Sequence, residues 1–414
     1  MSNYSLFIKN VSQLLASSAM AQLITIFVTI FIARIYTPEN FSDFGIFTAS
    51  IALMLTFGTG RLDLALIQVD KKEELSSILS NAILLLLISS SMLLVFTLFV
   101  YDFGFNLISI FFIFFGLILT GLTQIYSNLF SSLERYSEIG KFRIVTSITF
   151  GISALILGEI ENLREYGLLF STCIAQLLCL IFFIKGTDVK FSIQKYEDFK
   201  STIIEYKDYW SLDTLSSLMN TFGRQLPLLI FPSLLGQTIA GYYFFAQRIV
   251  AAPVNLIANS VGNVFRKQAT REYQKEGSFK KIFIFTFIRL FIICSLGLFL
   301  VLIFLDEDLI IILFGDEWAG MLDILFLVII FYSFKFIISP LTYSFYILRR
   351  LHWNLIGQFF YLFLLFTPIY IGYKMNLDPL LIVAFHVLGA IIAYSGYLIA
   401  SYICASEERT KHYD

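Results

Sequence analysis

The chain has 414 residues, of which 58% are hydrophobic, 17% aromatic and 14% charged. Soluble domains carry about 25% charged residues, so this composition excludes an ordinary soluble domain. The formal net charge of −1 says little, because the position of each charge along the chain carries the information. We expect an all-α, polytopic membrane protein.

Apolar stretches of about 20 residues recur along the whole chain, and each can cross a bilayer core of ~30 Å. The first half contains stretches at 11–33, 41–58, 76–100, 106–132, 139–158 and 166–185. The second half contains stretches at 207–233, 238–262, 281–305, 320–348, 353–373 and 379–404. They predict about twelve transmembrane helices in two six-helix lobes, 1–185 and 207–414, joined by a cytoplasmic linker at 186–206. The first stretch is too long for a signal-peptide core, so we expect a retained helix.

The sidedness of the chain follows from its 29 lysine and arginine residues. Most of them lie in alternate gaps between the apolar stretches, for example at 135–143, 185–207 and 266–281. The intervening gaps are acidic or bare, as at 159–165 and 306–317. Positively charged loops stay in the cytoplasm. We therefore expect a multi-pass protein with an even number of helices and both termini in the cytoplasm.

Similar polar stripes occur on the first and the seventh predicted helix. Each has polar residues at i, i+4, i+7 and i+11, which fall on one helix face. The two sets are Ser18, Gln22, Thr25 and Thr29, and Asp213, Ser217, Asn220 and Arg224. The match predicts a parallel repeat, with a pseudo-two-fold axis along the membrane normal. Coincidence between two helices that contain polar residues is the alternative.

Four cations lie inside apolar stretches: Arg224, Arg248, Arg289 and Lys335. A cation at the bilayer centre costs about 2.5–3.5 kcal/mol, so such residues normally face protein or water. Asn255 and Asn259 extend the polar face of Arg248 along the eighth predicted helix. We therefore expect the second half to be the more cationic one, and a cavity lined by these faces to attract anions. The alternative is that each cation is paired only for packing, and Arg289 is near enough to the cytoplasmic end to snorkel.

The sequence contains no motif that indicates an enzyme. The sequence lacks a phosphate-binding P-loop, and no catalytic pair of carboxylates stands out within a span. The four cysteines have neither metal-site nor disulfide spacing, and His386 is best explained by packing. We expect no catalytic residue, no metal site, no cofactor and no nucleic-acid partner. Arg61 and Asp63 lie at the cytoplasmic end of the second helix, where a structural loop or a gate competes with substrate contact.

Short phrases follow one another in order along the chain: Ala33-Arg34-Ile35-Tyr36-Thr37-Pro38-Glu39, Arg61-Leu62-Asp63-Leu64-Ala65, Gln225-Leu226-Pro227, Gly241-Tyr242-Tyr243, Ala246-Gln247-Arg248 and Phe314-Gly315-Asp316-Glu317-Trp318. In content and order they resemble bacterial polysaccharide and O-antigen flippases. That family belongs to the superfamily of multidrug, oligosaccharidyl-lipid and polysaccharide exporters. Asp63 stands where the family has glutamate.

The resemblance implies a transporter of the bacterial inner membrane with a central cavity between its two lobes. It implies that an oligosaccharide repeat unit of O-antigen, capsule or exopolysaccharide, linked to undecaprenyl diphosphate, moves from the cytoplasmic to the periplasmic leaflet by alternating access. It also implies coupling to a proton or sodium gradient. Membrane lipid, a glycan polymerase and chain-length proteins are the partners that such a carrier would have.

Under this hypothesis Arg224, Arg248 and Lys335 hold the diphosphate, because guanidinium and ammonium groups bind phosphate. Further polar residues are the candidates for substrate contact: Asn220, Asn255, Asn259, Asp213, Gln22 and Thr25. Three residues are candidates for a gate or a cytoplasmic-end site: Arg61, Asp63 and Arg289. The main rival function is an ion-coupled multidrug antiporter of the same superfamily, which would need acidic residues deep in its cavity. A glycan polymerase or ligase would need a larger outside loop, and a scaffold would need no cavity.

Overall fold

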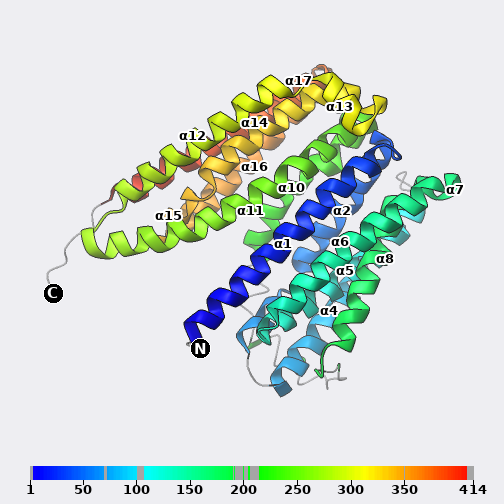
Figure 1. The fold of residues 1–414 in the computed structure, drawn as a ribbon, viewed down its shortest axis with the longest axis horizontal. Helices are drawn as coiled ribbons and strands as arrows, with labels where there is room; N and C mark the ends of the chain where they lie inside the picture. Colours follow the sequence, from blue (N-terminus) through cyan, green and yellow to red (C-terminus); the bar gives the residue numbers. More distant parts are fainter. Residues whose placement is uncertain are drawn as a thin grey trace. The chain divides into compact units, whose positions relative to one another are not determined.

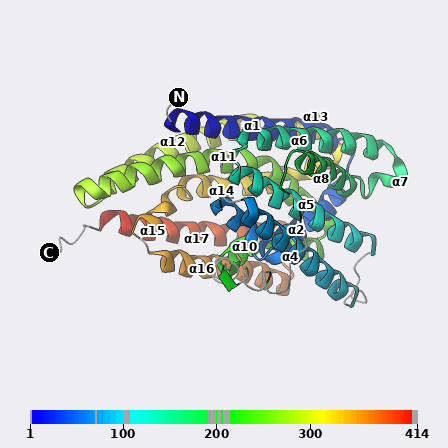
Figure 2. The same cartoon turned by 90° about the horizontal axis from the view of Figure 1, so that it is seen from below.

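A computed structural model describes residues 3–69, 72–99, 107–189, 214–348 and 350–407, with the isolated positions 191, 199, 204 and 205. Every regular element in these ranges is a helix, as Figures 1 and 2 show. The predicted all-α, polytopic class is therefore confirmed. The chain divides into two compact units, Met1–Ile230 and Phe231–Asp414, which are described one at a time.

The described residues of the first unit form long helices and a few short helical elements. Its long helices are α1 (Asn3–Ala33), α2 (Pro38–Gly58), α4 (Lys72–Phe99), α5 (Leu107–Ser132), α6 (Tyr136–Glu159), α8 (Gly167–Lys185) and the first part of α10 (Thr214–Leu235). Its short elements are α3 (Leu62–Ala65), η1 (Leu66–Gln68) and α7 (Glu161–Arg164). The predicted linker at 186–206 lies largely outside the described residues.

The second unit contains the remaining helices. These are α11 (Gln237–Glu276), α12 (Lys280–Phe304), α13 (Glu307–Phe314), η4 (Asp316–Met321), α14 (Leu322–Ile338), η5 (Leu341–Tyr343), α15 (Ser344–Ile347), α16 (Leu351–Lys374) and α17 (Pro379–Ser406). The predicted helix at 320–348 is interrupted after Ile338. Pro340 explains the break, because proline lacks the backbone donor that a continuing helix needs.

Ten helices of the described residues are long and apolar enough to cross a membrane, against the predicted number of about twelve. The difference falls on the seventh and eighth predicted spans. Both are helices in the structure, α10 and α11, but polar side chains such as Arg224, Arg248, Asn255 and Asn259 make them less apolar than the other spans. Helix α11 also runs 40 residues, past the predicted end at 262, because the segment up to Glu276 is charged but still helical. The two-fold relation between lobes and the domain boundaries stay predictions.

Helix α1 packs along α6, as Figure 1 shows. Glycines of α6 make the close approach possible, since a Cβ at Gly151 would meet the side chain of Val28 at 2.7 Å. A hydrogen bond of 3.2 Å from the Thr25 hydroxyl to Ser147 also joins the two helices. The polar stripe of the first helix therefore contributes to helix packing.

The turn after α2 positions the site described below. Thr37 caps the start of α2 in a capping box with Asn40, and Pro38 occupies the first turn. The helix ends at Gly58. Gly60 and Arg61 then adopt left-handed conformations, with φ of 56° and 58°, before the chain enters α3. Two consecutive left-handed residues reverse the chain sharply.

Candidate functional site

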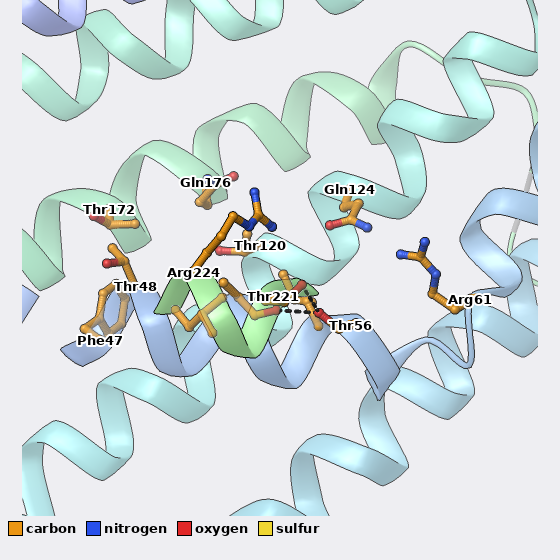
Figure 3. Close-up of a pocket in the computed structure, with 13 residues that line it drawn as sticks. Phe47, Thr48, Thr56, Arg61, Thr120, Gln124, Thr172, Gln176, Thr221 and Arg224 are labelled. Carbon is orange, nitrogen blue, oxygen red and sulfur yellow. Dashed lines mark hydrogen bonds between the residues drawn. The ribbon is translucent and has the colours of Figure 1, made fainter. Parts of the chain in front are cut away.

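A cavity of about 430 Å³ lies within the first unit. Helices α2, α5, α8 and α10 and the turn after α2 supply its walls, and Figure 3 shows it. The lining residues are Phe47, Thr48, Ile51, Ala52, Leu55, Thr56, Arg61, Thr120, Gln124, Thr172, Gln176, Thr221 and Arg224. Its volume falls within the range of small-molecule sites, about 300–1,000 Å³.

The chemistry of the lining is cationic and rich in neutral hydrogen-bonding groups. Five threonine hydroxyls and two glutamine amides accompany two guanidinium groups, and among the residues that the structure describes none that lines the cavity is acidic. Phe47, Ile51 and Leu55 form an apolar patch from α2. Such a lining favours an anionic ligand that also carries hydroxyl groups.

Several of the threonine hydroxyls are held by their own helices. Thr56 donates to the carbonyl of Ala52 at 2.9 Å and also lies 3.3 Å from the hydroxyl of Thr221 on α10. Thr48 lies 3.0 Å from the carbonyl of Phe44. A hydroxyl whose proton is used in this way presents an acceptor to its surroundings.

Arg61 reaches the cavity from the left-handed turn. Its Nη2 donates to the hydroxyl of Ser217 on α10 at 3.1 Å, and its side chain is half-buried. Arg224 comes from the same helix as Ser217 and is exposed. In Figure 3 the Arg224 guanidinium points to the side of the cavity lined by Thr120 and Gln176.

Asp63 lies behind the cavity wall and is fully buried. Its Oδ1 accepts from the hydroxyl of Thr59 at 2.6 Å. Its Oδ2 accepts from the side-chain amides of Gln124 at 2.9 Å and Asn128 at 3.0 Å, both on α5. Three donors satisfy a buried carboxylate that would otherwise be costly. Of these three donors, Gln124 alone belongs to the cavity lining.

The structure brings together two of the predicted site residues, Arg224 and Arg61. The prediction had given them separate roles, one in the substrate path and one at a gate, and had expected the cations in the second half. Asn220 is exposed on α10, next to the lining residue Thr221. Gln22 is half-buried on α1, and Thr25 bonds to α6. Asp213 lies outside the described residues.

The remaining predicted residues lie in the second unit. Arg248 is half-buried on α11, where the neighbouring Gln247 donates to the hydroxyl of Tyr332 at 3.2 Å. Asn255 is half-buried and Asn259 is exposed on the same helix. The ammonium of Lys335 lies 5.1 Å from the ring of Tyr332. Arg289 is exposed on α12, and its guanidinium lies 3.8 Å from the ring of Phe285. Their contact with substrate stays a prediction.

Sequence reasoning missed most of the polar lining, although a signal was present. The motif of threonine followed four residues later by glutamine occurs on α5, at Thr120 and Gln124, and again on α8, at Thr172 and Gln176. Residues at i and i+4 share one helix face. A repeated polar pair within otherwise apolar helices predicts a polar surface that avoids lipid.

Comparisons with known proteins agree with this fold. The profile of a family described as "Polysaccharide biosynthesis protein" matches residues 31–323. A multidrug resistance MATE family transporter of the MOP superfamily, in an inward-facing conformation, has a similar fold, with a TM-score of 0.70, 13% identity and coverage of 93% of this chain and 94% of that chain. No curated protein sequence matches the chain.

Two further solved structures share the fold. The lipid II flippase MurJ, in an inward closed conformation, aligns with a TM-score of 0.69 and 16% identity, over 94% of this chain and 88% of that chain. A MOP superfamily transporter from Pyrococcus furiosus, whose binding pocket is described as having reverse polarity, aligns with a TM-score of 0.60 and 12% identity over 95% of both chains.

The chain belongs to the polysaccharide biosynthesis protein family, because the family profile covers most of its length. Family and fold together define a polysaccharide biosynthesis protein built from many membrane-type helices, with the fold that these solved transporters share. The predicted membership is confirmed at this level.

Proposed function

We propose that the chain is a flippase for oligosaccharide repeat units linked to undecaprenyl diphosphate, of the kind used for O-antigen, capsule or exopolysaccharide. The observation that carries the proposal is the cavity lining, in which Arg61 and Arg224 occur with hydroxyls and amides and without a carboxylate. The substrate has both matching parts, a diphosphate with negative charge and sugars rich in hydroxyls.

Arginine suits the diphosphate because its planar guanidinium can donate two parallel hydrogen bonds to phosphate oxygens. The threonine and glutamine side chains then offer donors and acceptors to the sugar next to the diphosphate. A cavity of about 430 Å³ accommodates the headgroup but not a polyprenyl tail, which would remain in lipid. Arg248 and Lys335 of the second unit are further candidates for phosphate contact.

The carrier would lie in the bacterial inner membrane, with both termini in the cytoplasm, and would move its substrate outward by alternating access. An ion gradient of protons or sodium is the proposed energy source. Glycan polymerase and chain-length proteins are the proposed partners. Drug antiport is less well supported, because Asp63 already accepts three hydrogen bonds and does not line the cavity.

The test uses a strain that lacks the gene and carries Arg61→Ala, Arg224→Ala or the wild-type chain. Losing one charge-assisted contact removes about 1.5–3 kcal/mol, so we expect the flipping rate to fall about tenfold or more. Lipid-linked repeat units should accumulate, and surface glycan should fall. Arg61→Lys and Arg224→Lys should retain part of the activity, because they keep the charge but not the paired geometry.

Arg271→Ala is the matched control, because Arg271 is exposed on α11 of the second unit and does not belong to the cavity lining. Its surface glycan should stay near the wild-type amount. Normal surface glycan from Arg61→Ala and Arg224→Ala, at normal protein levels, would contradict the proposed role of the cavity.

A further inference from the structure

The hydrogen bonds around Asp63 determine which way one cavity side chain faces. A carboxylate only accepts hydrogen bonds, whereas a side-chain amide has donors on its nitrogen and acceptors on its oxygen. Gln124 therefore turns its nitrogen to Asp63, and the distance between Nε2 and Oδ2 is 2.9 Å. The two ends of a planar amide point in different directions, so Oε1 of Gln124 is directed away from Asp63.

Figure 3 shows the result of this constraint, with the oxygen of Gln124 on the side of Thr120 and Arg224 and the nitrogen on the side of Arg61. Asn128 lies one helical turn further along α5 and donates to the same oxygen of Asp63 at 3.0 Å. Asn128 does not belong to the cavity lining, whereas Gln124 does. One buried carboxylate thus holds two amides, and one of the two faces the ligand space.

We propose that Asp63 is a positioning residue that fixes the carbonyl oxygen of Gln124 as a hydrogen-bond acceptor toward the cavity. Rigid orientation matters because a glutamine that can rotate would offer donor and acceptor alike and would discriminate poorly. A fixed acceptor selects a ligand group that donates, which is a sugar hydroxyl or the N–H of an acetamido sugar. A phosphate oxygen is disfavoured at that point, because the phosphate oxygen and Oε1 of Gln124 are both acceptors and no hydrogen would lie between them.

The cavity would therefore have two zones of opposite hydrogen-bonding polarity. Arg61 and Arg224 donate and would take the diphosphate, and Gln124 accepts and would take the first sugar. This inference rests on the proposed function, because it assigns parts of the same substrate to parts of the same cavity. It adds a substrate requirement, a donor group on the sugar next to the diphosphate.

The experiment measures binding of two probes to the purified full-length chain in detergent, by calorimetry. One probe is farnesyl diphosphate, and the other is farnesyl diphosphate linked to N-acetylglucosamine. The dissociation constant of farnesyl diphosphate divided by that of the sugar-linked probe reports the contribution of the sugar. We expect Gln124→Leu and Asp63→Leu each to lower this ratio about two- to tenfold, the loss expected for one hydrogen bond between neutral groups.

Two further variants separate positioning from folding. Asn128→Leu removes the other amide that donates to Oδ2 of Asp63, and Asn128 does not line the cavity. This variant should therefore lower the melting temperature and leave the ratio unchanged. The double variant Asp63→Asn/Gln124→Glu restores the hydrogen bond in the reverse direction and keeps an acceptor toward the cavity. It should recover the ratio while weakening both probes, because it adds a negative charge beside the arginines.

An unchanged ratio in Gln124→Leu and Asp63→Leu would overturn the inference, as would equal weakening of both probes in every variant. If the wild-type chain binds both probes and the arginine variants lose both, while the ratio is insensitive to Asp63 and Gln124, only this inference fails. If the wild-type chain binds neither probe, the proposed function fails as well. Gln124→Leu keeps the test decisive should Asp63→Leu not fold.

Discussion

At the scale of single residues, Arg61 and Asp63 show how a turn separates two neighbours in sequence. The left-handed φ of 58° at Arg61 sends its guanidinium into the cavity. Two residues later, Asp63 is buried against α5. In the sequence the pair reads as one charged motif, which predicts a structural loop or a gate. The backbone conformation separates it into a cation that lines the cavity and a buried carboxylate that binds α5.

The packing of Tyr36 explains the phrase from Ala33 to Glu39, one of those that resemble the flippase family. Its hydroxyl donates to the carbonyl of Ala154 at 2.8 Å, and its ring leaves no space for a Cβ at Gly158 or Gly167. The side chain is almost fully buried. The phrase around Tyr36 therefore holds α6 and α8 to the end of α1, and its resemblance to the flippase family reflects structure at this point.

A prediction at the residue scale concerns Gly389 on α17. A Cβ at this position would lie 2.1 Å from the backbone oxygen of Leu364 on α16, and backbone cannot move aside as a side chain can. We expect Gly389→Ala to destabilise the second unit by about 1–3 kcal/mol, the usual cost of overpacking. The measurement is the melting temperature of the purified protein in detergent.

Gly396 on the same helix is the matched control, because no atom lies within 4 Å of a Cβ placed there. Alanine is the better helix former by about 1 kcal/mol, so Gly396→Ala should leave the melting temperature unchanged or raise it. Equal melting temperatures for Gly389→Ala and the wild type would show that α16 and α17 do not approach as closely as described.

At the scale of elements, the start of α2 is set by a short local signal. Thr37 accepts from the backbone N–H of Asn40 at 3.4 Å, and the Asn40 side chain accepts from the backbone N–H of Thr37 at 3.1 Å. These bonds satisfy donors that the first turn leaves free. Because they involve residues three positions apart, sequence alone contains the information for this helix start.

We expect Thr37→Ala to destabilise the fold by about 1 kcal/mol, since an N-cap hydroxyl is lost. Thr37→Ser keeps the hydroxyl and should remain close to the wild type. Thermal unfolding followed by fluorescence-detected gel filtration would measure both. An equal loss from the two substitutions would indicate that the methyl group of Thr37, rather than its capping bond, matters.

At the scale of the whole molecule, the alternation of basic and acidic gaps predicts which loops share a side of the membrane. Asn162 lies in an acidic gap and Gln268 in a basic one, and both are exposed. In a background in which the four native cysteines are replaced by alanine, Asn162→Cys should react with a membrane-impermeant maleimide on intact cells. Gln268→Cys should react only after permeabilisation, because positive loops remain in the cytoplasm.

The converse labelling pattern would reverse the predicted orientation. Labelling of both positions from one side would mean that an even number of spans separates Asn162 from Gln268, whereas three are predicted, and the predicted helix count would be wrong. The outcome bears directly on α10 and α11, the two helices that are less apolar than the other spans.

The success of sequence reasoning varied with the range of the interactions involved. The positions of most helices were predictable, because apolar length is a property of one segment. The interruption at Pro340 and the length of α11 were not predicted. Both follow from local rules, because helix-breaking and helix-capping residues determine where a helix ends as much as hydropathy does. Sequence reasoning singled out Arg224, which lines the cavity, but it did not single out the lining residues Gln124 and Gln176.

The sequence by itself determined that this protein is a bundle of membrane helices with a defined charge asymmetry, and it pointed to the family. Hydropathy and charge act along the chain, so no folding is needed to see them. Only the tertiary structure decided that Arg61 and Arg224 share one cavity with the polar pairs of α5 and α8. That decision depends on helix packing and on one left-handed turn, which bring together residues more than a hundred positions apart.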